Sequence, residues 1–530
     1  MTRRYLPRQA AGLARQLSRP YGVQFRPPRS RTGRTLLAVI GALVLVLVFA
    51  LLTDPEPVRA GSSAGTRVTV RSTIAVCPHL DSLAETRVAI AAPPAEPETS
   101  DDSGTGSAAK SKATVTKLGS KDKDSLLTIS EPGTTAYTDL STATKQPLVA
   151  RAAGAVAPGF AASQTTRTSG DAITRSLSGT PCPQAATEFW FAGTGSNGKS
   201  RTATLFLINP ENAPAQVDVE LYGDDGRVEA SGLDALTIPP GSVDRPHVLQ
   251  FAAAPHDRLV VHVVARVGRV AAALYDNAHD GVQPRGADWI PAVAAANTRL
   301  IVPAVPGGHG ERTLYLFVPG DDGALARLKV VGKSGTFSPA PDPKAGALDT
   351  IALEGNRLKQ VSLTEVAGGE PFGVLIEADR PVIAALRVGT GDDPPDFAYL
   401  AASPPLGGPS IVADARNQDD LTSKLVLTAP DQAASVTVVT MAQGKEPTDF
   451  GVVKIKAGVS REVSLGKIKG AFAILITPLP GSGPVYASRV LSERSSEGDL
   501  LTIEQFQPSH TTALVPDVVN DLSAGLRPGE

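Results

Sequence analysis

The stretch that most resembles a chemical site is the glycine-rich segment at residues 193–200, GTGSNGKS. It fits the phosphate-binding pattern G-x-x-x-x-G-K-[ST], in which backbone amides surround the phosphates, the lysine reaches the terminal ones and the hydroxyl holds Mg²⁺. Such a loop must follow a strand and open a helix. Residues 188–192 could form the strand, but residues 201–209 (RTATLFLIN) have the composition of a second strand. We therefore predict a turn between strands, with no nucleotide or other cofactor.

Metal-binding patterns are absent from the sequence. The seven histidines are scattered and form no H-E-x-x-H motif. The apolar neighbours of His262 favour a structural role for it. The run at residues 276–281 resembles the start of a calcium loop, but Ala278 and Ala287 stand where the loop needs ligands. We predict no metal site.

No residues are marked for hydrolysis either. Glycoside hydrolysis needs two carboxylates facing one cleft, and no pair stands out among the 53 acidic residues. No G-x-S-x-G elbow occurs. The two tryptophans, Trp190 and Trp289, give little support for sugar stacking. We predict a protein that is not an enzyme. The alternative is an extracytoplasmic polysaccharide-modifying or polysaccharide-binding protein with an unidentified carboxylate site.

The chain has only two cysteines, Cys77 and Cys182, each followed by proline. Both lie in the part of the chain that we expect to be exported, where two cysteines pair by default. We therefore predict a disulfide between them. The alternative is two buried thiols.

One apolar stretch predicts on which side of the membrane the cysteines and the other residues discussed above lie. Residues 35–52 (TLLAVIGALVLVLVFALL) carry no charge and, with Thr53, approach the roughly 20 residues that a helix needs to cross a bilayer. Nine arginines and no acidic residue or lysine precede the stretch, so the N-terminus should stay in the cytoplasm. Cleavage as a signal peptide near residues 58–60 is the alternative, although the basic arm is long for one. We predict a cytoplasmic arm (1–34), a transmembrane helix in the lipid bilayer (35–53) and a stalk (54–66).

Beyond the stalk the sequence is typical of an all-β protein. Short runs of Val, Thr, Ile and Leu alternate between turns rich in Gly and Pro, which number 50 and 44. This exported part carries 42 basic against 53 acidic residues, which leaves no concentrated basic face for nucleic acid.

A repeat of about 110 residues runs through the exported part. Val156, Val270, Val382 and Val485 each mark an apolar closing strand, at intervals of 114, 112 and 103 residues. This period fits an immunoglobulin-like β-sandwich. We predict about four tandem immunoglobulin-like units after the transmembrane helix. Their predicted bounds are 67–175 with a disordered insert at about 93–125, then 186–284, 298–392 and 408–497, followed by an extra strand and tail at 498–530.

The basic arm, the single span, the early Cys77-Pro78 and the repeats that close on V-A-A-like strands resemble an uncharacterised family of actinobacterial envelope proteins. This resemblance implies location and architecture, and it carries no functional residues. The sequence thus predicts a membrane-anchored, extracellular scaffold or interaction protein of the cell envelope, with an envelope protein or a glycan as its partner. A sensor that signals through the arginine-rich arm is a further hypothesis.

Overall fold

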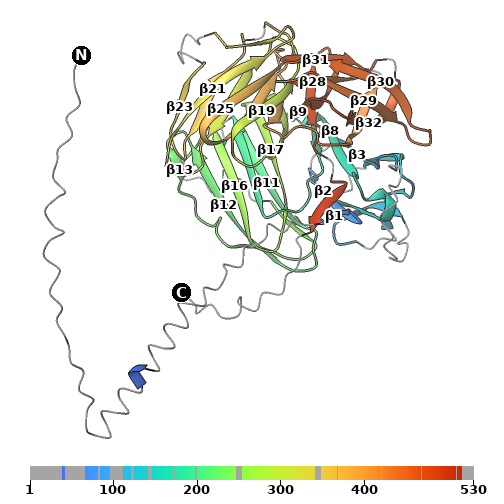
Figure 1. The fold of residues 1–530 in the computed structure, drawn as a ribbon, viewed down its shortest axis with the longest axis horizontal. Coiled ribbons are helices and arrows are strands. Elements are labelled where there is room, and N and C mark those ends of the chain that lie inside the picture. The colour runs from blue at the N-terminus through green and yellow to red at the C-terminus, as the bar shows by residue number, and fades with distance from the viewer. Residues whose placement is uncertain are drawn as a thin grey trace, which may run out of the picture. The chain divides into compact units, whose positions relative to one another are not determined.

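The computed structural model describes residues 39–41 and 66–515, except 81–83, 96–110, 121–123, 141–145, 172–173, 197–199, 246–253, 341–347, 367, 419, 467 and 509. The chain divides into two compact units, residues 1–66 with 515–530 and residues 67–514. The regular secondary structure of the described residues is almost entirely β-strand, as predicted (Figure 1). The predicted transmembrane helix lies outside the described residues except for 39–41. Among the residues described, no helix is long and apolar enough to span a membrane.

Four successive segments each fold into a pair of antiparallel sheets, here called sandwiches 1 to 4 (residues 72–181, 188–290, 297–401 and 410–505). Sandwich 1 contains β2 (Ser72–Cys77), β3 (Ala84–Ala91), β4 (Lys112–Lys117), β5 (Leu127–Ile129), β6 (Thr135–Leu140), β7 (Leu148–Ala153), the 3₁₀ helix η2 (Gly154–Val156), β8 (Ala161–Asp171) and β9 (Thr174–Pro181). Sandwich 2 contains β10 (Glu188–Thr194), β11 (Arg201–Asn209), β12 (Ala215–Gly223), β13 (Gly226–Val228), β14 (Leu236–Ile238), β15 (Ser242–Asp244), β16 (Leu259–Val267), β17 (Ala271–Asp280) and β18 (Gln283–Ile290).

The second half of the chain repeats this arrangement. Sandwich 3 contains β19 (Asn297–Val305), β20 (Arg312–Phe317), β21 (Ala324–Val331), β22 (Thr336–Phe337), β23 (Ile351–Leu353), β24 (Leu358–Ser362), β25 (Phe372–Gly389) and β26 (Phe397–Ala401). Sandwich 4 contains β27 (Ser410–Asn417), β28 (Leu421–Ala429), β29 (Ala434–Met441), β30 (Thr448–Ile455), β31 (Val459–Ser464), β32 (Gly470–Pro478), β33 (Tyr486–Glu493) and β34 (Leu500–Gln505).

The strand order is common to all four sandwiches. In sandwich 4 the sheets are β27-β32-β29-β30 and β31-β28-β33-β34, so positions 1, 6, 3 and 4 form one sheet and positions 5, 2, 7 and 8 the other. In sandwich 3 the long strand β25 serves as both the sixth and the seventh strand and joins the two sheets. A constant-type immunoglobulin domain instead places its strands A, B, E and D in one sheet and C, F and G in the other. The structure therefore shows repeated sandwiches without this immunoglobulin order.

Alternating side chains explain why these segments pair as sheets. In β12 every second side chain, including Val217, Val219 and Leu221, is buried in the sandwich core while the residues between them are partly exposed. Because side chains of a strand point to opposite faces in turn, one face of each sheet packs inward. The chain crosses the core at Val270, since the consecutive strands β16 and β17 belong to opposite sheets.

Within residues 67–514 the four sandwiches close into a ring, and Figure 1 shows them in chain order around a common centre. Val149 of sandwich 1 shares an apolar cluster with Trp289 of sandwich 2. Sandwiches 2 and 3 share one continuous core, and Tyr486 of sandwich 4 packs on sandwich 3. Ala89 of sandwich 1 and Ile411 of sandwich 4 share a further apolar cluster, which completes the ring.

The eighth strand of each sandwich lines the centre of the ring. β9 lies against β18, β18 against β26, β26 against β34 and β34 against β9. The predicted units end at 175, 284, 392 and 497, so each of them leaves out all of its eighth strand or all but the first two residues of it.

Two predictions for sandwich 1 were wrong. The insert expected at about 93–125 contains β4, because Ala113 and Val115 alternate with polar residues and are buried in the core; residues 96–110 lie outside the described part. Val156 belongs to η2 rather than to a closing strand, which begins only at Ala161. At the other end of the chain, the extra strand β35 (Thr512–Val515) pairs with β1 (Thr66–Thr69).

Candidate functional site

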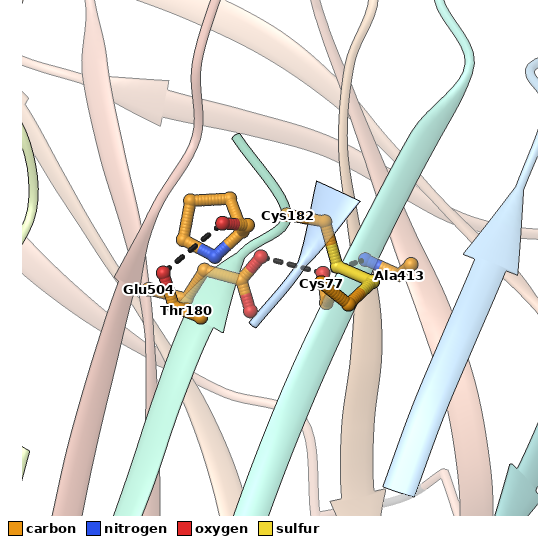
Figure 2. The surroundings of a disulfide bond; sticks show 7 residues. Cys77, Thr180, Cys182, Ala413 and Glu504 are labelled. Atoms are coloured by element: carbon orange, nitrogen blue, oxygen red, sulfur yellow. Dashed lines mark hydrogen bonds between the residues drawn. A yellow bond between two sulfur atoms is a disulfide. The ribbon is translucent and has the colours of Figure 1, made fainter. Parts of the chain in front are cut away.

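Cys77 and Cys182 form a disulfide bond, which confirms the predicted pairing. Cys77 ends β2 and Cys182 follows β9, so the bond joins the first strand of sandwich 1 to its exit segment (Figure 2). Both side chains are buried in the apolar cluster of this sandwich. The Val76 amide donates a hydrogen bond of 2.8 Å to the Pro183 carbonyl beside the bond. These contacts give the disulfide a structural role.

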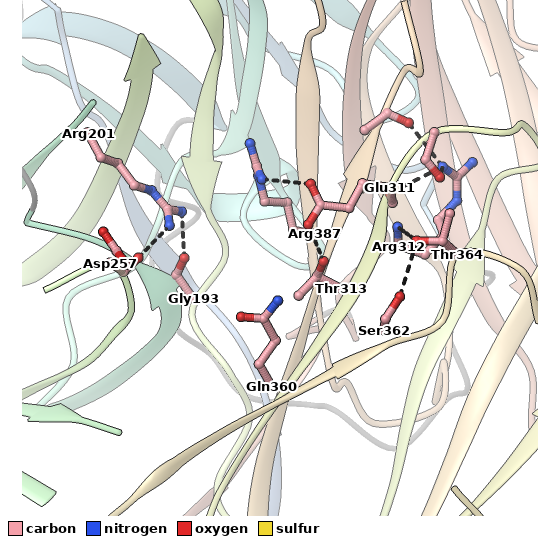
Figure 3. Close-up of polar contacts among 12 residues, drawn as sticks. Gly193, Arg201, Asp257, Glu311, Arg312, Thr313, Gln360, Ser362, Thr364 and Arg387 are labelled. Atoms are coloured by element: carbon pink, nitrogen blue, oxygen red, sulfur yellow. Dashed lines mark hydrogen bonds and ion pairs between the residues drawn. The ribbon is translucent and has the colours of Figure 1, made fainter. Parts of the chain in front are cut away.

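The glycine-rich segment at residues 193–200 connects two strands. β11 begins at Arg201, where a phosphate-binding loop requires a helix, so the predicted second strand is confirmed. The Arg201 guanidinium donates hydrogen bonds to the carbonyl oxygens of Gly193 (2.6 Å) and Asp257 (2.9 Å), as Figure 3 shows. An arginine of the protein thus holds the backbone of this turn. Lys199 lies outside the described residues.

His262 connects three neighbouring strands of sandwich 2. Its Nδ1 lies 3.0 Å from Glu220 Oε2 and its Nε2 lies 3.0 Å from Glu188 Oε1. The ring of Trp190 stacks on the imidazole with 3.6 Å between centroids. The histidine therefore covers one face of the indole, and this row of side chains has the structural role that we predicted for His262.

Asp276, the first residue of the calcium-like run, lies in the middle of β17 and contacts a cation of the protein. Its Oδ2 lies 2.7 Å from Arg201 Nη2 and accepts a 2.7 Å hydrogen bond from the hydroxyl of Tyr399 in β26. This buried triad joins sandwich 2 to sandwich 3. In the described part of the chain, no three His, Cys, Asp or Glu residues are grouped so that they could hold a metal ion.

A buried carboxyl group lies where the four eighth strands meet. Asp396 directly precedes β26 and has no exposed surface. Its Oδ2 accepts hydrogen bonds from the amides of Leu177 in β9 (3.2 Å) and Leu501 in β34 (3.0 Å), and its Oδ1 accepts one from Ala287 in β18 (3.3 Å). One side chain of sandwich 3 thus binds the backbone of the other three sandwiches.

Asp288 of β18 makes a second connection of this kind. Its Oδ1 accepts hydrogen bonds from the amides of Gly179 in sandwich 1 and of Trp289, both at 2.9 Å. The hydroxyl of Thr502 in sandwich 4 lies 3.3 Å from each of its two oxygens. The Asp288 side chain is 1% exposed.

Both aspartates have raised pKa values. Burial raises the pKa of Asp396 to about 7, although four amide hydrogen bonds lower it. Burial also raises the pKa of Asp288 well above its ordinary value, and the charge of Asp396 adds to the rise. Carboxyl groups with such shifts often mark functional sites. Because these two are sealed from solvent, their chemistry in this conformation is to hold the ring together rather than to meet a substrate.

Glu504 of β34 is a further buried carboxyl group between sandwiches. Its Oε1 accepts a 2.5 Å hydrogen bond from Ser163 Oγ of sandwich 1, and its Oε2 lies 2.8 Å from Arg489 Nη2. The amide of Ala413 donates to the same Ser163 oxygen at 3.1 Å, in the region drawn in Figure 2. Burial raises the pKa of Glu504 to about 7, against the lowering effect of Arg489.

Residues 134–466 match a family of unknown function, DUF5719. The chain belongs to the DUF5719 family. No curated protein matches it. The matched region contains Asp288 and Asp396 together with β9, β18 and β26, whereas β34 and Glu504 lie beyond it. Asp288 and Asp396 are therefore both part of the DUF5719 region. We call them the axial aspartates, because they lie where the eighth strands meet.

The DUF5719 region also carries a surface groove of about 480 Å³ on sandwich 3. Lys333 Nζ and Glu370 Oε1 lie 2.9 Å apart at the groove, and the Phe337 side chain is 42% exposed beside them. Its lining consists of Gly332, Lys333, Ser334, Gly335, Thr336, Phe337, Val366, Glu370 and Pro371. An exposed aromatic ring beside a charged pair can contact a sugar or an extended peptide.

The sequence-based reasoning found the disulfide and missed the axial aspartates. Each of these aspartates has an aromatic residue directly after it, Trp289 or Phe397, in a short run that is otherwise apolar. An isolated acid inside a buried strand must be hydrogen-bonded or protonated. That signal could have singled out both residues, had the eighth strands been recognised.

Proposed function

We propose that this DUF5719 protein is a membrane-anchored, extracellular scaffold or interaction protein of the cell envelope, without enzymatic activity. The observation that carries the proposal is the set of bonds made by Asp396, whose carboxyl group binds the backbone of three other sandwiches. A ring joined in this way presents its outer sheet faces and loops at fixed positions, as a scaffold requires. The shared strand order supports the further proposal that the sandwiches are tandem copies of one unit.

The disulfide supports a location outside the cytoplasm. Structural disulfides such as Cys77–Cys182 persist in oxidising compartments and are rare in the cytosol. The arginine-rich arm before the apolar residues 35–53 supports a single-pass topology with the N-terminus inside. The proposed partner is an envelope protein or a glycan.

Protease treatment of intact cells tests the location. We expect cleavage in the stalk at residues 54–66 to release the disulfide-bonded portion, while the arm at residues 1–34 stays protected. If that portion survived in intact cells and was degraded only after lysis, the extracellular location would be rejected.

Crosslinking in intact cells tests the scaffold role. We expect the full-length protein to retain a specific envelope protein or glycan. The matched control is residues 1–66 fused to an unrelated secreted domain, which keeps the anchor and removes the ring. Equal capture by the two proteins would count against the proposal.

Polysaccharide binding is the second candidate, and the groove with the exposed Phe337 favours it. We expect Phe337→Ala to weaken retention of the full-length protein on isolated envelope polysaccharide by roughly tenfold, because stacking on an aromatic ring supplies about 1 kcal/mol or more. Leu325→Ala, at another exposed apolar residue, is the control. Retention that is unchanged by both substitutions would remove this candidate.

A further inference from the structure

The centre of the ring combines two features. Two carboxyl groups are removed from water, and the hydrogen bonds that hold them cross between sandwiches rather than staying within one. We propose that closure of the ring is coupled to proton uptake by Asp288 and Asp396, so that acid tightens the ring and rising pH loosens it.

The physical basis of this coupling is that both carboxyl groups are buried without a positively charged side chain paired to them. Among the described residues, neither aspartate forms an ion pair, so an ionised carboxylate there is stabilised only by amides and a hydroxyl. Moving a charged carboxylate out of water costs several kcal/mol, which hydrogen bonds only partly offset. Two such groups that feel each other's charge resist ionising together, and the pair tends to keep a proton.

The positively charged side chains near the two aspartates are paired with other carboxylates. Arg175 on β9 pairs with Glu497, and Arg285 on β18 pairs with Asp280 and Asp393. The other titratable groups on the elements packed around the aspartates are Tyr275, Asp276 and His279 on β17, Asp392 before β26, Tyr399 on β26, and Asp499 and Glu504 on β34. Of these, Glu504 is paired with Arg489 and Asp276 with Arg201.

The direction of the effect follows from the folded and unfolded pKa values. In the folded ring burial raises the pKa of Asp396 from 3.8 to about 7. The stability that comes from its protonation is therefore fully present below pH 3.8 and is lost as the pH rises through about 7. Asp288, whose pKa burial also raises, adds to the effect in the same direction.

The loosening should be local. The amides that contact Asp396 belong to Leu177, Ala287 and Leu501, on three different eighth strands, whereas the core clusters of sandwiches 1 and 4 are built from hydrophobic side chains. Ionisation should thus open the contacts between eighth strands before any sandwich unfolds. A rise in pH would expose the inner strands, and a fall would close them again.

Hydrogen exchange of the full-length protein in detergent tests the proposal. Peptides containing Leu177 and Leu501 would be compared at about pH 6 and about pH 8, after correction for the intrinsic pH dependence of exchange. With a folded pKa near 7, linkage predicts protection roughly tenfold higher at the lower pH. Peptides from the sandwich core, such as that containing Val219 of β12, should show no such change.

Asp396→Asn should reduce the pH dependence of the axial peptides, and Asp225→Asn, in an exposed turn, should leave it unchanged. If Asp396→Asn does not fold, Asp288→Asn serves as the second variant. Equal protection of the wild-type axial peptides at both pH values would overturn the proposal. So would a folded Asp396→Asn or Asp288→Asn protein that kept the full wild-type pH dependence.

Discussion

The side-chain amide of Gln505 forms two hydrogen bonds with the backbone of Ala401, one from the Ala401 amide to Oε1 and one from Nε2 to the Ala401 carbonyl, each 2.8 Å long. Gln505 ends β34 and Ala401 ends β26, so this side chain hydrogen-bonds two eighth strands of different sandwiches. Both residues are at most 4% exposed. Together with the carboxyl groups of Asp288 and Asp396, this amide makes the centre of the ring a polar junction.

Replacing this amide should weaken the ring. Gln505→Leu keeps the size of the side chain but leaves a buried amide and a buried carbonyl of Ala401 unpaired, which we expect to lower the free energy of unfolding by about 2 kcal/mol. Urea denaturation of the purified protein would measure the loss. Gln507→Leu, at an exposed position two residues later, is the control. If the two variants were equally stable, the contribution of this bond pair would be refuted.

The Arg201–Asp276 pair lies within sandwich 2 beside Tyr399 of sandwich 3, and it allows a test of how much its buried charges contribute to stability. Asp276→Asn leaves the guanidinium without its carboxylate, which should cost about 3 kcal/mol. Replacing both partners, with Arg201→Met and Asp276→Leu, should cost less than the single change because no charge remains buried. Calorimetry of the wild type and the variants would measure the difference. A double variant that was less stable than Asp276→Asn would contradict this account.

The strand content and the disulfide could be predicted because both depend on local or compositional signals. Val217, Val219 and Leu221 alternate with polar residues, and this period of two marks a strand wherever it lies in the chain. The two cysteines needed no structural information, since no other partner exists for either of them. The closing strands of sandwiches 2 to 4 were also visible, because each begins with or contains an apolar run, whereas β8 of sandwich 1 is mostly polar and was misplaced.

The eighth strands could not be predicted in this way. β9 (TRSLSGTP) and β18 (QPRGADWI) contain Gly, Pro and Ser and show no clean alternation, so their sequence favours turns. They are strands because they pair with β8 and β17 and because the ring buries five residues of each. Such long-range contacts override local propensity. The axial aspartates depend on these strands and were therefore missed with them.

The disulfide should contribute strongly to stability. The bond between Cys77 and Cys182 spans 105 residues, and in the chain-entropy model a loop of this length is worth about 5 kcal/mol. Replacing both cysteines with alanine should lower the urea midpoint substantially, and a reducing agent should destabilise the wild type alone.

Blocking free thiols in intact cells before lysis should leave both cysteines unlabelled. Labelling of both would show reduced thiols and contradict the predicted compartment.

Asp414 should show a pH dependence opposite to that of the axial aspartates. Burial tends to raise its pKa, but Arg416, whose Nη2 lies 2.6 Å away, lowers the pKa below its ordinary value overall. The stability that comes from its charge is therefore present above pH 3.8 and is lost as the pH falls through the lower folded pKa.

Asp414→Asn should accordingly cost about 3 kcal/mol near neutral pH, because the largely buried Arg416 loses its partner. The difference from the wild type should begin to shrink as the pH is lowered from about 5 to about 3, since the carboxylate of the unfolded chain takes up a proton there while the folded carboxylate keeps its charge to lower pH. Urea denaturation across this range would measure it, with Asp420→Asn at an exposed position as the control. A difference that stayed constant over the range would show that packing, and not the charge of Asp414, accounts for the loss.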